Sequence, residues 1–179
     1  MIIPDPKMNK HLEKLQHLFN SNIIMNWSNL NKCILILSLA CTMHLLWLFW
    51  KIFILLTPSL WHWVDMSLLK FQIYLNLASF FLLLFLILPC WLFQGKQWAE
   101  TALPYAILNI FVAVIMRDGY FIGLFSPATV IAFICISGLG LILFEHRFVY
   151  FPLIFACIVY IILSYLTLTH DLPYSPLFT

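Results

Sequence analysis

The feature that most constrains this chain is a series of five long apolar stretches separated by short polar connections. At about 1.5 Å per residue, a helix of about 20 residues crosses the hydrocarbon core of a bilayer. A mean hydropathy of +1.00 is typical of membrane proteins rather than of soluble domains. The sequence therefore predicts an all-α integral membrane protein, a bundle of about five transmembrane helices. The stretches are residues 33–56, 71–93, 101–116, 120–144 and 148–168, and the third is the shortest.

Residues 1–32 precede the first stretch and carry an amphipathic pattern. Their apolar side chains fall on one helical stripe, which is typical of a short helix lying in the membrane interface. Docking of this helix onto another subunit is the alternative interpretation. We expect residues 1–32 to be a cytoplasmic leader rather than a cleaved signal peptide, because the apolar run begins too late. The stripe comprises Met8, Leu12, Leu15, Leu18 and Phe19.

The distribution of lysine and arginine predicts the orientation. Of the nine basic residues, six fall on the leader's side of the predicted spans and three fall on the other side. The positive-inside rule then places the N-terminus in the cytoplasm. Five spans leave residues 169–179 outside. The three basic residues on the outer side are Lys51, Lys70 and Arg117.

An Arg-Asp-Gly step interrupts the apolar sequence between the third and fourth stretches. Arg117, Asp118 and Gly119 therefore predict a three-residue turn that makes the two helices antiparallel neighbours. Gly119 and Gly123 form a G-x-x-x-G pattern, which lets another backbone approach closely. Pro127 follows on the same face and is expected to kink the fourth helix or loosen its first turns. We interpret the pattern as helix packing, with a moving part in signalling as the alternative.

Within the apolar stretches, few polar side chains are available for chemistry. His44, Asn76 and Asn109 are expected to hydrogen-bond neighbouring helices. The stretches as drawn contain no Asp or Glu, and no catalytic motif occurs. The five cysteines show no metal-ligand spacing and resemble small apolar residues. The sequence thus predicts no catalytic, cofactor-binding or metal-binding residues in this chain.

Several titratable residues are expected to share the outer face. Histidine and aspartate are the types that respond to metals or protons, but their spacing does not define a site. We interpret them as solvated loop residues, with a ligand pocket as the alternative. A net charge of +2, scattered along the chain, argues against nucleic acid as a partner. These residues are His62, Asp65, Asp118, His170 and Asp171.

The last third of the chain resembles a known family. Residues 117–150 contain G-L-F-S-P-A-T and G-L-I-L-F-E-H-R-F-V-Y, and residues 172–178 read L-P-Y-S-P-L-F. These segments are similar to the MASE-type membrane sensor regions of bacterial GGDEF diguanylate cyclases and class III nucleotidyl cyclases. The resemblance implies one more span and then a cytoplasmic cyclase module. Neither is present in this sequence, so no catalytic residue is carried over.

The combined interpretation is a membrane-embedded sensory input region for a cyclic-nucleotide output. Its candidate sensing or packing residues are His44, His62, Asp65, Arg117, Asp118, Gly119, Gly123, Pro127 and His170. Expected partners are the lipid bilayer, a second copy through the G-x-x-x-G face, and a downstream cyclase domain. The alternatives are a stand-alone membrane protein that serves as a transporter or channel subunit, or an assembly factor. A lipid-modifying enzyme is disfavoured because the stretches as drawn lack catalytic acids.

Overall fold

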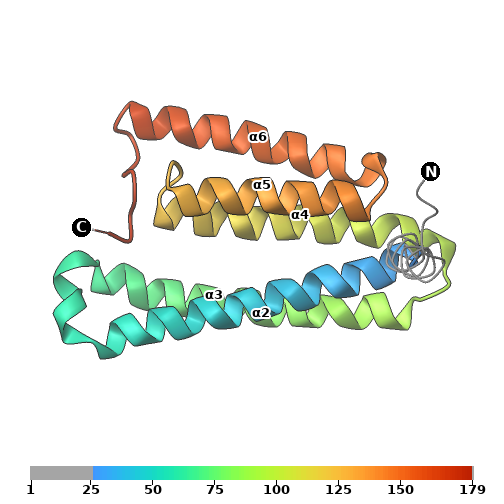
Figure 1. The fold of residues 1–179 in the computed structure, drawn as a ribbon, viewed down its shortest axis with the longest axis horizontal. Helices are drawn as coiled ribbons and strands as arrows, with labels where there is room; N and C mark the ends of the chain where they lie inside the picture. The colour runs from blue at the N-terminus through green and yellow to red at the C-terminus, as the bar shows by residue number, and fades with distance from the viewer. Residues whose placement is uncertain (1–25, 179) are drawn as a thin grey trace, which may run out of the picture.

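The computed structural model describes residues 26–178, which form antiparallel helices joined by short connections (Figure 1). We call the end where α2 begins the leader end and the opposite end, where α6 ends, the tail end. Within the described residues the fold is all-helical, as predicted, apart from one isolated bridge between Val64 and Phe178. The elements are α2 (Asn29–Leu56), the 3-10 helix η1 (Pro58–Trp63), α3 (Met66–Leu92), α4 (Gln97–Ile122), α5 (Pro127–Leu143) and α6 (His146–Leu168).

Four of the helices are long and apolar enough to cross a membrane: α2, α3, α4 and α6. The fifth, α5, has only 17 residues. The expectation that the third stretch is the shortest is therefore wrong, because the helix that contains it extends over 26 residues. The predicted interfacial helix of the leader lies outside the described residues.

The predicted turn at Arg117, Asp118 and Gly119 is also wrong, because these residues form the last turns of α4. The connection to α5 instead runs from Gly123 to Ser126. Two charged residues between apolar stretches usually indicate a turn. A charge that is paired inside a bundle can nevertheless remain helical.

Side-chain caps define where two helices start at opposite ends of the bundle. Ser28 accepts a hydrogen bond from the backbone N–H of Asn31 at the start of α2. Asp65 accepts from the backbone N–H groups of Ser67 and Leu68 at the start of α3. These bonds satisfy donors that have no partner within the helix. Asp65, a candidate sensing residue, is thus a capping residue in the structure.

The helices divide into two groups. Helix α2 packs most extensively against α3, and α4 packs mainly against α6. Figure 1 shows α2 and α3 side by side, with α4, α5 and α6 forming the other part of the bundle. Contacts between α2 and α4 join the two groups.

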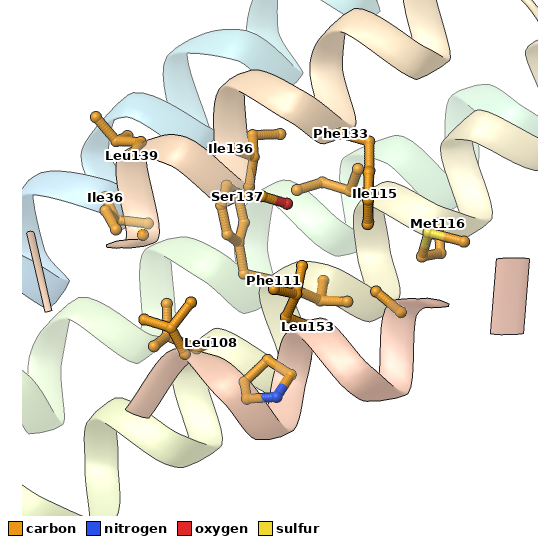
Figure 2. Close-up of a pocket in the computed structure, with 15 residues that line it drawn as sticks. Ile36, Leu108, Phe111, Ile115, Met116, Phe133, Ile136, Ser137, Leu139 and Leu153 are labelled. Carbon is orange, nitrogen blue, oxygen red and sulfur yellow. The ribbon is translucent and has the colours of Figure 1, made fainter. Parts of the chain in front are cut away.

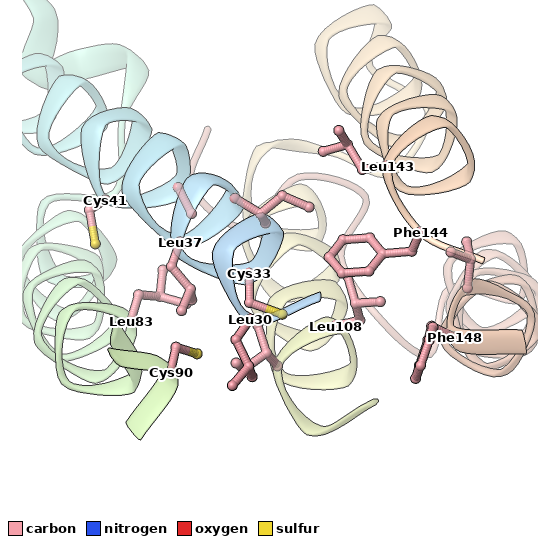
Figure 3. Close-up of a cluster of buried hydrophobic side chains, with 14 of the residues drawn as sticks. Leu30, Cys33, Leu37, Cys41, Leu83, Cys90, Leu108, Leu143, Phe144 and Phe148 are labelled. Atoms are coloured by element: carbon pink, nitrogen blue, oxygen red, sulfur yellow. The ribbon is translucent and has the colours of Figure 1, made fainter. Parts of the chain in front are cut away.

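The main apolar cluster lies toward the leader end (Figure 3). Leu30 and Leu37 of α2, Leu83 of α3 and Phe148 of α6 are fully buried in it. Cys33 and Cys90 also face each other there, from α2 and α3. All five cysteines are free thiols. This cluster joins the two groups of helices mainly by apolar packing, beside a hydrogen bond from the Leu30 N–H to the Glu100 carboxylate.

The segment after α6 crosses the tail end of the bundle (Figure 1). The backbone N–H of Leu177 donates to the Phe121 carbonyl at 3.2 Å, and the Leu177 carbonyl accepts from the Asp65 N–H at 3.1 Å. The Ser175 hydroxyl donates to the Ile122 carbonyl at 2.7 Å. Leu177 itself is buried beside Ile54. The segment therefore ties the end of α6 to both groups of helices.

Candidate functional site

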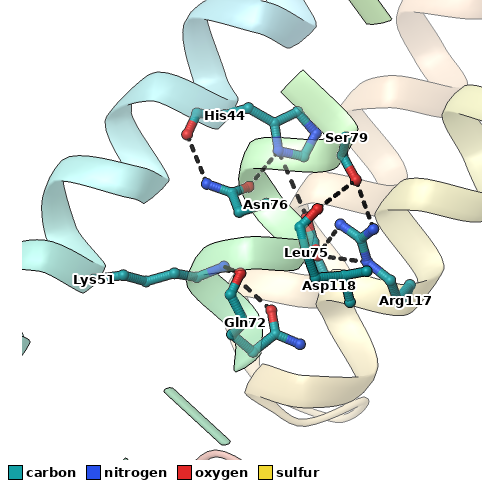
Figure 4. Close-up of polar contacts among 8 residues, drawn as sticks. All are labelled: His44, Lys51, Gln72, Leu75, Asn76, Ser79, Arg117 and Asp118. Carbon is teal, nitrogen blue, oxygen red and sulfur yellow. Dashed lines mark hydrogen bonds and ion pairs between the residues drawn. The ribbon is translucent and has the colours of Figure 1, made fainter. Parts of the chain in front are cut away.

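A group of polar side chains is buried between α2, α3 and α4 in the tail half of the bundle (Figure 4). We call it the polar cluster. Ionisable groups buried among apolar helices are costly to desolvate and are often functional, so this is the strongest candidate site. The cluster comprises His44, Lys51, Gln72, Asn76, Ser79, Arg117 and Asp118.

His44 and Asn76 join α2 to α3 by two hydrogen bonds. The Asn76 amide nitrogen donates to the His44 backbone carbonyl at 2.9 Å, which turns the amide oxygen toward the imidazole. His44 Nδ1 lies 2.5 Å from that oxygen, so Nδ1 is the nitrogen that carries the proton. The prediction that both residues hydrogen-bond a neighbouring helix is confirmed. Asn109 does not do so, since its amide donates to the Tyr105 carbonyl of its own helix.

Arg117 and Asp118 bring α4 into the cluster. Arg117 donates to Asp118 Oδ1 through Nε at 3.0 Å and through one terminal nitrogen at 2.6 Å. The other terminal nitrogen donates to the Ser79 hydroxyl at 2.6 Å, across to α3. Asp118 Oδ2 lies 3.9 Å from His44 Nδ1 on α2. One charged pair on α4 therefore contacts both helices of the other group.

The position of Asp118 corrects two expectations. It does not lie in a solvated outer loop, because its side chain is 21% exposed and is paired inside the bundle. The apolar helices also do not lack acids, since α4 contains both Glu100 and Asp118. Asp118 is misplaced because the predicted third span ends before the Arg-Asp-Gly step, and Glu100 is left out because that span begins at residue 101.

Lys51 occupies the part of the cluster nearest the tail end. It lies on α2 and is 4% exposed, so it is not an outer loop residue. Its ammonium group donates to the Gln72 side-chain oxygen at 3.2 Å and to the Gln72 backbone carbonyl at 3.5 Å. Among residues 26–178, no carboxylate lies within ion-pair distance of it. Neutral oxygens alone therefore solvate this ammonium group.

Three candidate residues from the sequence form the corner between α4 and α5. A Cβ on Gly119 would lie 2.7 Å from Thr129 Cγ2, so the helices can approach this closely only at glycine. Gly123 ends α4 with φ +121°, a conformation that favours glycine. Pro127 begins α5 at a position where its missing N–H costs nothing, so it does not kink the helix.

The corner also shows how the glycine pattern is used. The Thr129 hydroxyl donates to the Gly123 carbonyl at 2.9 Å and closes the end of α4. A Cβ on Gly123 would meet Ser175 and Tyr174 of the segment after α6. The predicted G-x-x-x-G face thus belongs to α4 rather than to the fourth span, and it is occupied by contacts within the chain.

The remaining candidates lie outside the polar cluster. His62 belongs to η1 and packs against Trp63, with ring centroids 4.7 Å apart. His170 follows α6 and is exposed, with φ 64°. In the described part of the chain, no group of three or more His, Cys, Asp or Glu side chains could hold a metal ion. From the predicted set, the structure brings His44, Arg117 and Asp118 together in the polar cluster and Gly119, Gly123 and Pro127 together at the corner between α4 and α5. His62, Asp65 and His170 belong to neither group.

A second feature is an apolar cavity enclosed by α2, α4, α5 and α6 (Figure 2). Its volume is about 40 Å³, and Phe111, Phe133 and Ile136 are among its lining residues. Ser137 is the single hydroxyl-bearing residue in the lining. A space of this size and polarity is a packing gap rather than a ligand site.

Sequence reasoning missed Lys51, Gln72 and Ser79. The sequence pattern that could have found them is their spacing. Lys51 follows His44 by seven residues, and Ser79 follows Gln72 by seven, with Asn76 between them. Residues separated by four or seven positions share one face of a helix. Two polar stripes on consecutive apolar helices therefore predict a buried polar interface.

The sequence matches no protein-family model, and comparison with curated proteins and with solved structures gave no match.

Proposed function

We propose that the chain is a multi-pass protein of a bacterial inner membrane, with five spans and a cytoplasmic N-terminus. Helix α5, with its 17 residues, is near the lower limit for a span. Of the exposed lysine and arginine side chains among residues 26–178, Lys96 and Arg147 lie at the leader end, where Lys32 is buried. At the tail end, Lys70 is the single exposed basic side chain among residues 26–178, because Lys51 and Arg117 face the bundle. This asymmetry supports a cytoplasmic leader end.

The orientation can be tested with reporter fusions after residue 179. Alkaline phosphatase fused there is expected to be active in a bacterial host, and green fluorescent protein at the same position is expected to be dark. The reverse pattern would show that the number of spans or the orientation is wrong.

We further propose that the chain is a sensory input region that regulates a cyclic-nucleotide output. The observation that carries this proposal is the charged contact between the two groups of helices, formed by Arg117 with Ser79 and by Asp118 with His44. A signal that binds one packing of the groups more tightly than another would shift the equilibrium between them. The resemblance of residues 117–150 to MASE-type sensor regions supports a cyclase as the output.

The direct test measures intracellular cyclic di-GMP in cells that express the native gene in its full reading frame. Asp118→Asn is expected to change the cyclic di-GMP level, because it breaks the contact between the groups. Lys70→Gln is the matched control and is expected to leave the level unchanged, since Lys70 is an exposed cation at the same end. No cyclase activity in the wild type, or equal levels in wild type and Asp118→Asn, would contradict the proposal.

A transport function is the second candidate. The observation that favours it is the presence of Lys51 and Asp118 inside helices that were expected to lack buried charge. Ion flux across liposomes containing the purified chain, abolished by Asp118→Asn, would favour transport over sensing.

A further inference from the structure

We propose that Lys51, Gln72 and Arg117 form a binding site for a small monovalent anion in the tail half of the bundle. The site concerns binding chemistry alone and does not depend on a sensory role. Three observations lead to it: an unbalanced buried charge, a surplus of hydrogen-bond donors, and the geometry of Gln72.

The first observation is the charge of the polar cluster. Arg117 and Asp118 neutralise each other through two hydrogen bonds. Lys51 then contributes one positive charge that no described carboxylate pairs with. A buried charge without a counterion is costly unless the group loses its proton or binds an ion of opposite sign. A single negative charge balances this cluster.

The second observation is the number of free donors. The Gln72 amide nitrogen is buried and has no hydrogen-bond partner, and the residue is 1% exposed. Arg117 uses three of its five N–H groups, on Asp118 and Ser79. Lys51 donates only to the two oxygens of Gln72. This set of donors lacks an additional acceptor, and leaving a buried hydrogen bond unmade destabilises the fold.

The third observation fixes the direction of the amide. Because Lys51 donates to the Gln72 side-chain oxygen, the amide N–H groups must point away from that oxygen. Figure 4 shows Lys51 reaching from α2 to Gln72 on α3, with the Arg117–Asp118 pair on the other side of the cluster. The amide therefore offers two N–H donors on the side of Gln72 away from the ammonium group, in a cluster that also carries cationic donors, and such donors bind anions.

The binding chemistry points to a halide or another compact monovalent anion. One negative charge matches the net charge of the cluster, whereas sulfate or phosphate would reverse it. Chloride accepts hydrogen bonds from any direction and therefore suits donors from three different residues. A lipid-derived carboxylate has the same charge, so the experiment must distinguish it from a free anion.

The test compares the melting temperature of the detergent-purified protein in sodium chloride and in sodium gluconate, at constant pH and ionic strength. Gluconate is much larger than chloride, so chloride is expected to raise the melting temperature in a saturable manner. Line broadening of ³⁵Cl in nuclear magnetic resonance measures binding without reference to stability. Equal melting temperatures in the two salts together with no line broadening would overturn the proposal. A rise in melting temperature that appears only with laurate would show that the site binds a lipid carboxylate and would overturn the proposal of a free anion.

Three variants locate the site. Lys51→Gln is expected to weaken chloride binding about 10- to 100-fold, since a charge-assisted hydrogen bond is worth about 1.5–3 kcal/mol. Lys70→Gln, an exposed cation at the same end, should bind chloride as the wild type does.

Gln72→Glu tests the site even if the Lys51→Gln variant folds poorly. Its carboxylate would give Lys51 a counterion, so the protein should be stable in gluconate and insensitive to chloride. Chloride dependence that persists unchanged in Lys51→Gln or in Gln72→Glu would place the anion elsewhere and contradict this site.

Discussion

Helices α2, α3 and α4 meet twice along their length, and the two meeting points differ in chemistry. Toward the leader end they meet through apolar side chains such as Leu37, Leu83 and Leu108. In the tail half the same helices meet through His44, Asn76 and Arg117. Helices in a bilayer gain little from hydrophobicity, so both interfaces depend on fit. The apolar interface requires shape alone, but the polar one requires that every charge and donor be matched.

Because the two interfaces differ in this way, substitutions at the two ends are expected to destabilise the protein for different reasons. A missing methyl group at the apolar end leaves a small cavity and costs packing energy. A missing partner at the polar end leaves a charge or a donor without compensation, which costs more per atom removed. The polar end is therefore where a bound ion or a signal can alter the packing of the two groups of helices.

The largest expected effect is that of Asp118→Asn, which removes the negative charge that balances Arg117. Removing one partner of a fully buried pair costs about 3–5 kcal/mol, and because Arg117 and Asp118 are 23% and 21% exposed we expect a loss near the lower end of this range. Unfolding by sodium dodecyl sulfate titration in mixed micelles measures this free energy. Asp171→Asn is the control, because Asp171 is exposed.

A double variant makes the Asp118 prediction more specific. Arg117→Gln combined with Asp118→Asn removes both charges, so it should recover part of the lost stability. If the double variant loses as much unfolding free energy as the two single variants lose together, the two residues do not act as a pair.

Leu83→Ala tests the apolar end. Leu83 is fully buried in the main cluster, and Leu→Ala substitutions in cores cost about 2–5 kcal/mol. We expect a loss in the lower part of this range, since lipid replaces water as the reference environment. The same titration measures it, and chloride dependence of the melting temperature should be unchanged. A loss of chloride dependence in Leu83→Ala would show that the two ends are not independent.

Asn76→Leu has a smaller expected effect at the polar end. It removes the acceptor of His44 Nδ1 and the donor to the His44 carbonyl. Leaving such groups without a partner costs about 1–3 kcal/mol. Asn109→Leu is the matched control, because that amide bonds only within its own helix and should cost less. Equal losses of unfolding free energy in the two variants would mean that the His44–Asn76 hydrogen bonds between α2 and α3 add no stability of their own.

The sequence predicts the helical class because apolar runs of this length leave few other structures. It also predicts the contact between His44 and a neighbouring helix. It does not predict where α4 ends, because Arg117 and Asp118 are normally signals of a connection. Their helical conformation depends on Ser79 and His44, which lie 38 or more residues earlier in the chain.

Lys51 shows the same limitation. In the sequence it is a lysine five residues before the end of an apolar helix, where a snorkelling side chain is the usual interpretation. Its burial depends on Gln72, which lies on the next helix and accepts both of its hydrogen bonds. Polar residues at helical spacing on two consecutive spans are the only sign of this contact in the sequence.

The smallest expected effect belongs to the ion pair at the leader end. Glu145 and Arg147 are 2.7 Å apart, as close as the Arg117–Asp118 pair within 0.1 Å, but their side chains are 63% and 60% exposed. Exposed ion pairs contribute about 0–1 kcal/mol because solvent screens them. Glu145→Gln should therefore change the unfolding free energy by less than Asp118→Asn does, although both remove one carboxylate from an arginine at the same distance. Because the two pairs differ in burial and in the second hydrogen bond that Arg117 makes to Asp118, equal losses in the two variants would show that the polar end gains nothing from its enclosure.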